Sequence, residues 1–163
     1  MNTEIDFYID GAYENVNDFD CDYKVFNDYL QKHIPDDKAV FHYIINADND
    51  ELIAYFSLLS SCVIVGDLSN YDFVPAVELK MFAIDKRYQG KNLSNKLIDA
   101  AINIVNEITL EDIGARVLIL YSVPAEKVVK MYEKSGFTKM PEHFSMYKSY
   151  FSDGCIPMVR MIR

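Results

Sequence analysis

Three stretches of the chain space their apolar residues three or four positions apart, which is typical of an amphipathic helix. We expect helices over residues 21–33, 91–108 and 125–135. The second is the clearest, because its apolar residues fall on one face: Leu93, Leu97, Ile98, Ala101, Val105 and Ile108. Asp20 or Asp22 is suited to cap the first helix, since a short acidic side chain can accept hydrogen bonds from free backbone N–H groups.

Other stretches are rich in β-branched and aromatic residues and are expected to form strands. They cover residues 5–9, 39–46, 52–65, 76–85, 116–121 and 156–162. The segment Ala47-Asp48-Asn49-Asp50 predicts a hairpin turn, residues 66–75 predict a polar, aromatic loop, and residues 112–114 predict a second turn. Serines within residues 52–65 leave open a bend or a break in that strand.

The order of these elements indicates a mixed α/β fold, with antiparallel hairpins early in the chain and a strand–helix–strand–helix unit late. The chain has 163 residues and shows no linker, repeat or low-complexity tract, so we expect residues 1–163 to form one domain. Half of the residues are hydrophobic, and 12 Tyr and 10 Phe supply large side chains, so the chain can bury a sizeable core.

Several classes of protein are disfavoured by this sequence. No apolar run reaches the roughly 18–20 residues that a membrane helix needs, and the first ten residues resemble no secretory signal. Cys21, Cys62 and Cys155 are widely spaced and form no metal-binding pattern with His. We therefore expect a cytoplasmic protein with reduced thiols, no metal and no membrane contact.

Charge is unevenly distributed along the chain, whose net charge is −9. Residues 1–75 carry 15 acidic and 3 basic side chains, a balance of −12, whereas residues 76–163 carry 10 acidic and 13 basic ones, a balance of +3. Ordinary solvated surfaces are the default interpretation of both halves. The absence of a basic stripe disfavours general nucleic-acid binding, which depends on neutralising phosphates.

The most informative residues belong to a strand that leads through a short loop into a helix, between Glu78 and Ile98. Backbone N–H groups at the start of such a helix have no intrahelical partners, and together with the helix dipole they suit an anion such as pyrophosphate. Four cationic side chains flank this point: Lys86, Arg87, Lys91 and Lys96. Spacing alone leaves an ordinary, solvated helix start as the alternative.

Within this stretch, Gln89-Gly90-Lys91-Asn92-Leu93-Ser94 resembles the acetyl-CoA loop of the GNAT superfamily of N-acetyltransferases, Q/R-x-x-G-x-G/A. Asn92 and Ser94 depart from that pattern. Asn is the non-glycine residue that best tolerates left-handed backbone angles, and Ser is small enough to leave room for a phosphate. The resemblance implies that residues 89–94 hold the pyrophosphate of acetyl-CoA. It also implies a splayed, mostly antiparallel GNAT sheet with helices on both faces.

A second block lies downstream on the last expected helix. Val129-Lys130-Met131-Tyr132-Glu133-Lys134-Ser135-Gly136-Phe137 resembles the family's F-Y-E-K-x-G-F block, and its Gly is suited to end the helix. The resemblance implies that Tyr132 lies near the CoA sulfur and protonates the leaving thiolate. An ordinary Tyr pKa of about 10 keeps the hydroxyl protonated at neutral pH. The alternative for Tyr132 is a core-facing aromatic, since apolar neighbours share its helical face.

The same resemblance implies that main-chain groups of Phe82, Ala83 and Ile84 hold pantetheine and the acetyl carbonyl, an oxyanion-hole role. It also makes Glu78 a candidate base, because a glutamate four residues before Phe82 serves histone-type relatives. Strand alternation predicts that one face of this strand presents Glu78, Lys80 and Phe82, and the other Leu79, Met81 and Ala83. A solvent-facing Glu78–Lys80 pair and a water as the base remain alternatives.

The acceptor amine is the least determined part. Three N-terminal segments, 18–21, 26–30 and 51–58, resemble the opening of a toxin-type branch that acetylates aminoacyl-tRNA and is paired with antitoxins. In the family the N-terminal elements form the acceptor side, and here they are acidic. We therefore expect a small or peptidic cationic amine and regard nucleic acid as an unfavourable partner. A toxin acting on aminoacyl-tRNA and a catalytically weak CoA-binding module are the alternatives, and a homodimer is one option for the assembly.

Overall fold

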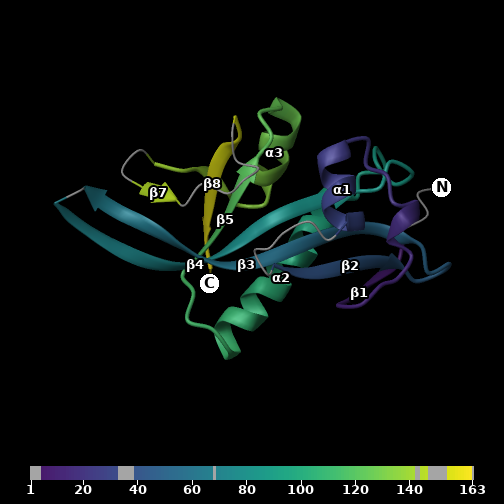
Figure 1. Cartoon of the computed structure of the whole chain (residues 1–163), viewed down its shortest axis with the longest axis horizontal. Helices are drawn as coiled ribbons and strands as arrows, with labels where there is room; N and C mark the ends of the chain where they lie inside the picture. The colour runs from purple at the N-terminus through teal and green to yellow at the C-terminus, as the bar shows by residue number, and fades with distance from the viewer. Residues whose placement is uncertain (1–4, 33–38, 68, 142–143, 147–153, 163) are drawn as a thin grey trace.

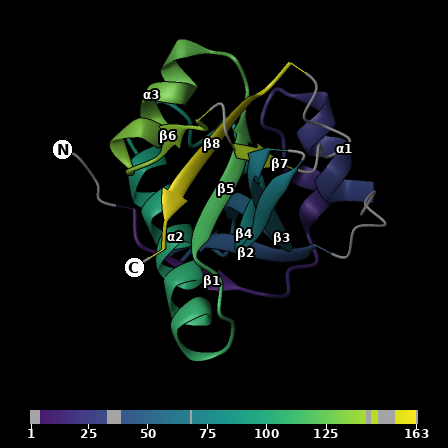
Figure 2. The same ribbon diagram turned by 90° about the vertical axis from the view of Figure 1, so that its left-hand side faces the viewer.

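The computed structural model describes residues 5–32, 39–67, 69–141, 144–146 and 154–162. In this part of the chain one 8-stranded sheet carries helices on both faces (Figures 1 and 2). The strands lie in the order β1-β2-β3-β4-β5-β8-β6, and β7 pairs with β3. Of the described strand pairs, β4 and β5 alone run parallel. The predicted mixed α/β, mostly antiparallel architecture is confirmed.

The elements agree with the sequence pattern to within a few residues, apart from the hairpin described next. The strands are β1 (Phe7–Asp10), β2 (Val40–Asn46), β3 (Leu52–Asp67), β4 (Asn70–Ile84), β5 (Val117–Ser122), β6 (Thr138–Lys139), β7 (Phe144–Met146) and β8 (Ile156–Met161). The helices are α1 (Lys24–Lys32), α2 (Ser94–Glu111) and α3 (Glu126–Lys134), and Val16–Asp18 forms a single 3-10 turn. The short elements β6, β7 and the 3-10 turn carry too few residues for a periodic pattern.

The loop predicted over residues 66–75 is wrong, because β3 and β4 continue there as a long hairpin arm (Figure 1). Val63 pairs with Val74 and Ile64 with Phe73, so the arm keeps its register almost to its tip. The polar residues of this segment suggested a loop. They alternate with aromatic and β-branched ones, however, and a strand that is solvated on one face tolerates that alternation.

The first helix begins at Lys24, three residues later than its pattern suggests, and neither predicted cap is used. Asp22 adopts a left-handed φ of 68°, which turns the chain just before the helix. The Asp20 carboxylate accepts hydrogen bonds from the N–H of Asp22 at 2.9 Å and the side-chain amide of Asn27 at 2.8 Å. Asp20 therefore holds the turn before the helix instead of capping the helix.

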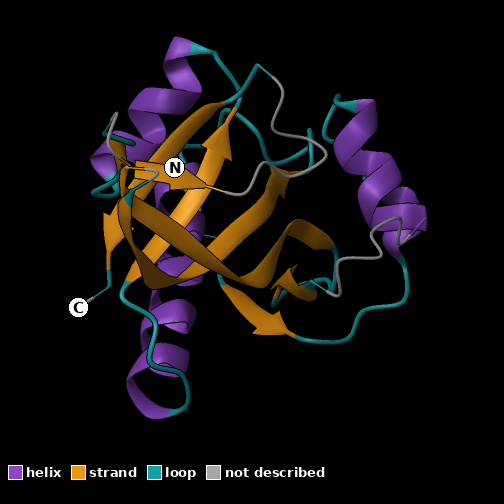
Figure 3. Cartoon of the chain, turned by 60° about the vertical axis from the view of Figure 1, so that its left-hand side comes forward, coloured by secondary structure: helices purple, strands orange, loops and turns teal. Residues whose placement is uncertain are grey.

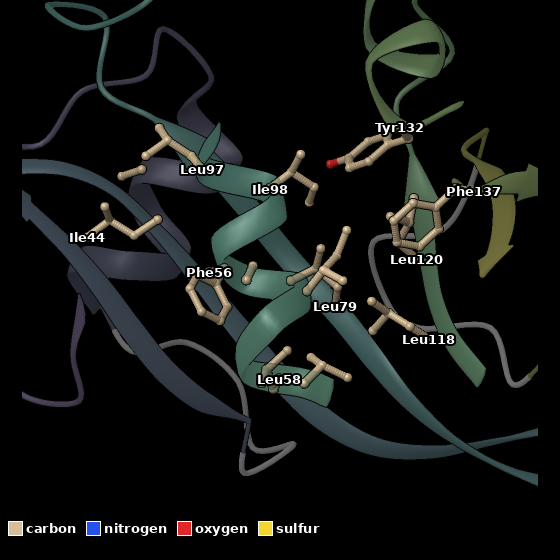
Figure 4. Close-up of a cluster of buried hydrophobic side chains, with 14 of the residues drawn as sticks. Ile44, Phe56, Leu58, Leu79, Leu97, Ile98, Leu118, Leu120, Tyr132 and Phe137 are labelled. Carbon is tan, nitrogen blue, oxygen red and sulfur yellow. The ribbon is translucent and has the colours of Figure 1, made fainter. Parts of the chain in front are cut away.

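The core is divided between the two faces of the sheet. On one face α2 and α3 cover a cluster that includes Ile44, Phe56, Leu97 and Leu118 (Figure 4). On the other face α1 buries its Tyr29 among aromatic residues of β2 and β3. Burying one large apolar side chain stabilises a fold by about 1.5–3 kcal/mol, so both sets of helices are firmly held against the strands between them.

Candidate active site

A cleft opens where β4 and β5 separate. The two strands pair from Ala76 to Glu78 of β4, and beyond Glu78 no described strand pairs with this edge of β4. The cleft has a volume of about 800 Å³ and is lined along one side by residues 79–84 of β4. Figure 3 shows α1 on one side of the sheet and the other two helices across it. Phe82, Ala83 and Ile84, which are expected to hold pantetheine, all line this cleft.

A bulge in β4 decides which side chains share a face. Pairing with β3 skips Lys80, so β4 has one extra residue between Leu79 and Met81. The predicted alternation is wrong for this reason. Leu79 lies with Phe82 in the core under α2 and α3, whereas Met81 faces the core under α1. The extra residue also places Glu78 on the α1 face, where its charge acts on Tyr29 of α1.

The loop before α2 leaves backbone donors free. Gly90 and Asn92 adopt left-handed φ angles of 72° and 57°, so Asn92 takes the conformation for which the family pattern has Gly. The N–H of Leu97 bonds to Leu93 O at 3.0 Å, while no acceptor in the described chain meets the N–H groups of residues 90–95. All of these residues except Lys91 line the cleft. Free N–H groups at a helix start bind anions, and this arrangement suits a pyrophosphate.

Two of the cations predicted to flank this anion site are engaged elsewhere. The Lys86 ammonium lies 2.7 Å from the Asp20 carboxylate, and Arg87 bonds to Asp85 at 2.8 Å and to Glu51 at 3.3 Å. Their charges are therefore balanced inside the protein, and the predicted contribution of Lys86 and Arg87 to the anion site is wrong.

The Gln89 side chain and Lys91 are likewise used within the protein. The Gln89 amide donates to Ile84 O at 2.8 Å and to Cys21 O at 3.2 Å. The Lys91 ammonium lies over the Tyr88 ring, 4.8 Å from its centroid. The side chain of Gln89 thus ties the loop to neighbouring segments.

Positive charge reaches the cleft mainly from α3. Lys127, Lys130 and Lys134 line it, and their spacing of three and four residues places them on one stripe of the helix. Lys130 pairs with Glu126 at 2.5 Å, whereas no described carboxylate pairs with Lys127 or Lys134. Lys80 of β4 also lines the cleft, and no Asp or Glu of the described chain does. The cleft is therefore positively charged on the side of α3.

Tyr132 lies in the last turn of α3, with 7% of its surface exposed. Its ring packs edge-on against Phe137 with the centroids 5.7 Å apart, and Figure 4 shows its hydroxyl directed toward Ile98 of α2. Tyr132 lines the cleft, and burial raises the pKa of its hydroxyl. The group therefore stays protonated at neutral pH. The core-facing alternative holds for the ring of Tyr132, which also lines the cleft, and its role as the acid stays a prediction.

Glu78 is buried, with 4% of its surface exposed, so the predicted solvent-facing pair with Lys80 is wrong. Its Oε1 atom has no hydrogen-bond partner in the described chain, and burial raises the pKa of its carboxyl to about 7. A carboxyl of this pKa is half-ionised at neutral pH, which suits proton transfer. Glu78 does not itself line the cleft, although its neighbours Leu79 and Tyr121 do.

Comparison with known families decides the class of this protein. The model of the family described as "Acetyltransferase (GNAT) domain" matches residues 9–151. The chain belongs to the GNAT acetyltransferase family. It is an acetyl-CoA-dependent N-acetyltransferase, as the sequence predicts. No curated protein matches the chain.

Solved structures of GNAT toxins share its fold. A bacterial toxin superposes with a TM-score of 0.74 at 16% identity, over 98% of this chain and 92% of that chain. A Tyr-to-Phe mutant of the AtaT toxin, bound to acetyl-CoA and the C-terminus of the antitoxin AtaR, gives 0.71 at 19%, over 96% and 94%. AtaT complexed with acetyl-methionyl-tRNAfMet gives 0.65 at 22%, over 87% and 94%. The predicted likeness to the toxin-type branch is confirmed at the level of the fold.

Several lining residues of this GNAT cleft were not predicted. The α1 side of the cleft is lined by Cys21, Tyr23, Val25 and Phe26. They are here termed the acceptor wall, because the sequence resemblance implies that the N-terminal elements form the acceptor side. No motif marks these residues, because their place in the cleft depends on how α1 packs on the sheet. The α3 lysines, in contrast, were visible as an i, i+3, i+7 pattern in the sequence.

The histidines and cysteines supply no catalytic cluster in the described chain. His42 is half-buried and stacks on Phe56, and burial lowers its pKa. His33 and His143 lie outside the described residues. Cys21, which is buried, and Cys62 and Cys155, which are half-buried, form no disulfide in the described part of the chain. Among the described residues no group could hold a metal ion, and no helix is long and apolar enough to cross a membrane.

Proposed function

We propose that this GNAT enzyme acetylates an α-amino group, with aminoacyl-tRNA as its acceptor class. One observation carries the proposal: the cleft is lined by four lysines and, in the described chain, by no carboxylate. A Lys side chain or polyamine has a pKa near 10.4 and would enter protonated, with no counter-ion beside it. An α-amine, with a pKa of roughly 7.7–8.0, is partly neutral at physiological pH and ready to attack. The fold shared with AtaT, solved with acetyl-methionyl-tRNAfMet, supports the same acceptor class.

The reaction follows from the residues around the cleft. The N–H groups of residues 90–95 bind the pyrophosphate, and the open edge of β4 holds pantetheine and polarises the acetyl carbonyl. The amine nitrogen forms the new C–N bond while the C–S bond breaks. Tyr132 gives its proton to the departing thiolate. Glu78 takes the amine proton through a water, because its carboxyl lies behind the cleft lining.

The left-handed conformation of Asn92 supports CoA binding, which an active enzyme and a CoA-binding module share. Its φ of 57° is the geometry that the glycine of the family pattern allows. The departure from that pattern therefore leaves the backbone of the loop in the form that anion binding needs.

A small or peptidic cationic amine is the second candidate acceptor. It is favoured by the acidic balance of −12 in residues 1–75. Part of that charge is neutralised by cations from the second half of the chain, since Asp20 pairs with Lys86 and Glu51 with Arg87. The exposed Asp22 beside the acceptor wall remains available to attract a cation.

The first test is binding of CoA and acetyl-CoA by thermal shift. At 100 times its dissociation constant, a ligand stabilises the fold by about 2.7 kcal/mol. The second test is transfer of labelled acetyl from acetyl-CoA to charged tRNA, to peptides with free N-termini, and to polyamines, aminoglycosides and Lys peptides. We expect charged tRNA to be labelled fastest. Faster labelling of polyamines or Lys peptides would establish the cationic acceptor instead, and the absence of any thermal shift would refute the acetyl-CoA site.

A further inference from the structure

The segment before α1 is fastened to the cofactor loop by hydrogen bonds. The N–H of Asp20 donates to Asp85 Oδ2 at 3.1 Å, and the N–H of Lys86 donates to Asp20 O at 2.8 Å. The Lys86 ammonium bonds to Asp20 Oδ2 at 2.7 Å, and the Gln89 amide donates to Cys21 O at 3.2 Å. These four contacts between Asp20 or Cys21 and the residues Asp85, Lys86 and Gln89 are here termed the latch.

A buried carboxylate stands at the centre of the latch. Asp85 has 1% of its surface exposed, and its oxygens also accept from Arg87 N–H at 2.9 Å, Nε at 2.8 Å and Nη2 at 3.1 Å. Burial alone would raise the pKa of Asp85, but the hydrogen bonds from Arg87 and Asp20 lower it overall. The carboxylate therefore stays charged, and every one of these donors is held in a set position.

The latch joins two parts of the cleft that have different tasks. On one side it leads directly into the free N–H groups of residues 90–95. On the other side it leads into the acceptor wall, where Cys21, Tyr23, Val25 and Phe26 follow within six residues of Asp20. A displacement of the loop is therefore transmitted to the wall.

We propose that Asp85 and Gln89 are positioning residues that couple the cofactor loop to the acceptor wall. A pyrophosphate on residues 90–95 orders the loop, the latch passes this order to the wall, and the acceptor meets a wall that is already in place. The inference rests on the proposed acetyl-CoA site. Gln89 thereby acts through its side chain on the acceptor side, in addition to its expected place in the cofactor loop.

The experiment compares two single substitutions, each of which removes the side-chain amide of one Gln. Gln89→Leu keeps the size of an exposed side chain and removes the bonds to Cys21 O and Ile84 O. Gln31→Leu is the matched control, because the Gln31 amide donates to Phe19 O at 2.9 Å and Asn17 O at 3.2 Å, ahead of the same helix but away from the loop. Backbone hydrogen exchange is measured in residues 21–27 and 91–97, with and without saturating CoA.

In the wild type and in Gln31→Leu, we expect CoA to slow exchange in both segments, about fivefold or more in residues 21–27, the lower end of usual coupling between sites. In Gln89→Leu the protection of residues 91–97 should remain while that of residues 21–27 is lost. Protection of residues 21–27 that persists in both Gln89→Leu and Asp85→Asn would overturn the coupling. Protection of residues 91–97 alone in the wild type would also overturn it, and no protection in either segment would refute the CoA site as well.

Discussion

The cofactor side and the acceptor wall of the cleft consist of different chemical groups. We propose that the cofactor side recognises phosphate charge through the backbone N–H groups of residues 90–95 and the lysines of α3. The acceptor wall uses Tyr23, Val25 and Phe26, which offer apolar and aromatic surface. Backbone donors change little with sequence, whereas a side-chain wall changes with every substitution. A loop motif in the sequence can therefore indicate the cofactor, whereas no such motif indicates the acceptor.

The largest effect is expected at Tyr132, which we propose lies beside the reacting atoms, between the cofactor side and the acceptor wall. Tyr132→Phe removes one hydroxyl, and the ring can keep its contact with Phe137. We expect acetyl-CoA binding to survive and kcat to fall by about 10²–10⁴-fold, the usual worth of acid catalysis.

Tyr121→Phe is the matched control, because it removes a hydroxyl from the same cleft. Its kcat should fall far less than that of Tyr132→Phe. Equal kcat values for the wild type and Tyr132→Phe, with the chemical step rate-limiting, would reduce Tyr132 to a packing residue.

The second test measures stability and catalysis separately at Glu78, which lies on the α1 face of the sheet. Its native pKa of about 7 exceeds the ordinary 4.5, so the folded state holds a proton that the unfolded state has lost between these pH values. The unfolding free energy therefore falls as pH rises through this window, by on the order of 3 kcal/mol. Glu78→Gln should remove that loss, making the variant more stable than wild type above pH 7 and about equally stable below pH 4.5.

Urea unfolding across this pH range measures the difference. The same variant should lose activity most at low pH, where the amine most needs a base. A variant with wild-type activity at every pH would exclude Glu78 as the base and leave that role to water.

The third test concerns the positive charge of the α3 lysines on the cofactor side of the cleft. Reversing charge in Lys127→Glu with Lys134→Glu should raise the Kd of acetyl-CoA roughly tenfold, as expected when two exposed ion pairs of 0.2–1 kcal/mol are lost or reversed. Binding should also depend less on salt. Lys139→Glu, an exposed lysine that does not line the cleft, is the control. Equal Kd values for the double variant and the control would place the phosphates elsewhere.

The smallest expected effect concerns the backbone of the cofactor loop. Asn92→Ala places a residue with a poor left-handed conformation at φ 57° and should cost about 1 kcal/mol of unfolding free energy. Asn92→Gly should be close to neutral, because glycine adopts this angle freely. Chemical denaturation of both variants checks the difference. An alanine variant as stable as the glycine variant would show that the loop relaxes to another backbone conformation.

Much of the architecture could be predicted from local pattern. The three helices and most strands follow from apolar periodicity, since α2 buries Leu97, Ile98 and Ala101 as its spacing requires. The left-handed angle at Asn92 was also predictable, because it depends on local backbone sterics, whereas the cofactor-binding role of this loop stays a prediction. The hairpin arm was missed, since its polar residues resemble those of a loop when the opposite strand is unknown.

The sequence by itself indicated the family and most of the elements, because these depend on residues close together in the chain. The position of the cofactor loop stays a prediction. Only the tertiary structure decided what depends on distant partners. The bulge at Lys80 reversed the facing of Glu78 and buried it, because pairing with β3 skips one residue there. Lys86 and Arg87 pair with carboxylates instead of flanking the anion site, and two of these carboxylates, Asp20 and Glu51, come from remote segments. The charge balance and burial of a residue depend on the residues that surround it in space, and its neighbours in the sequence do not specify them.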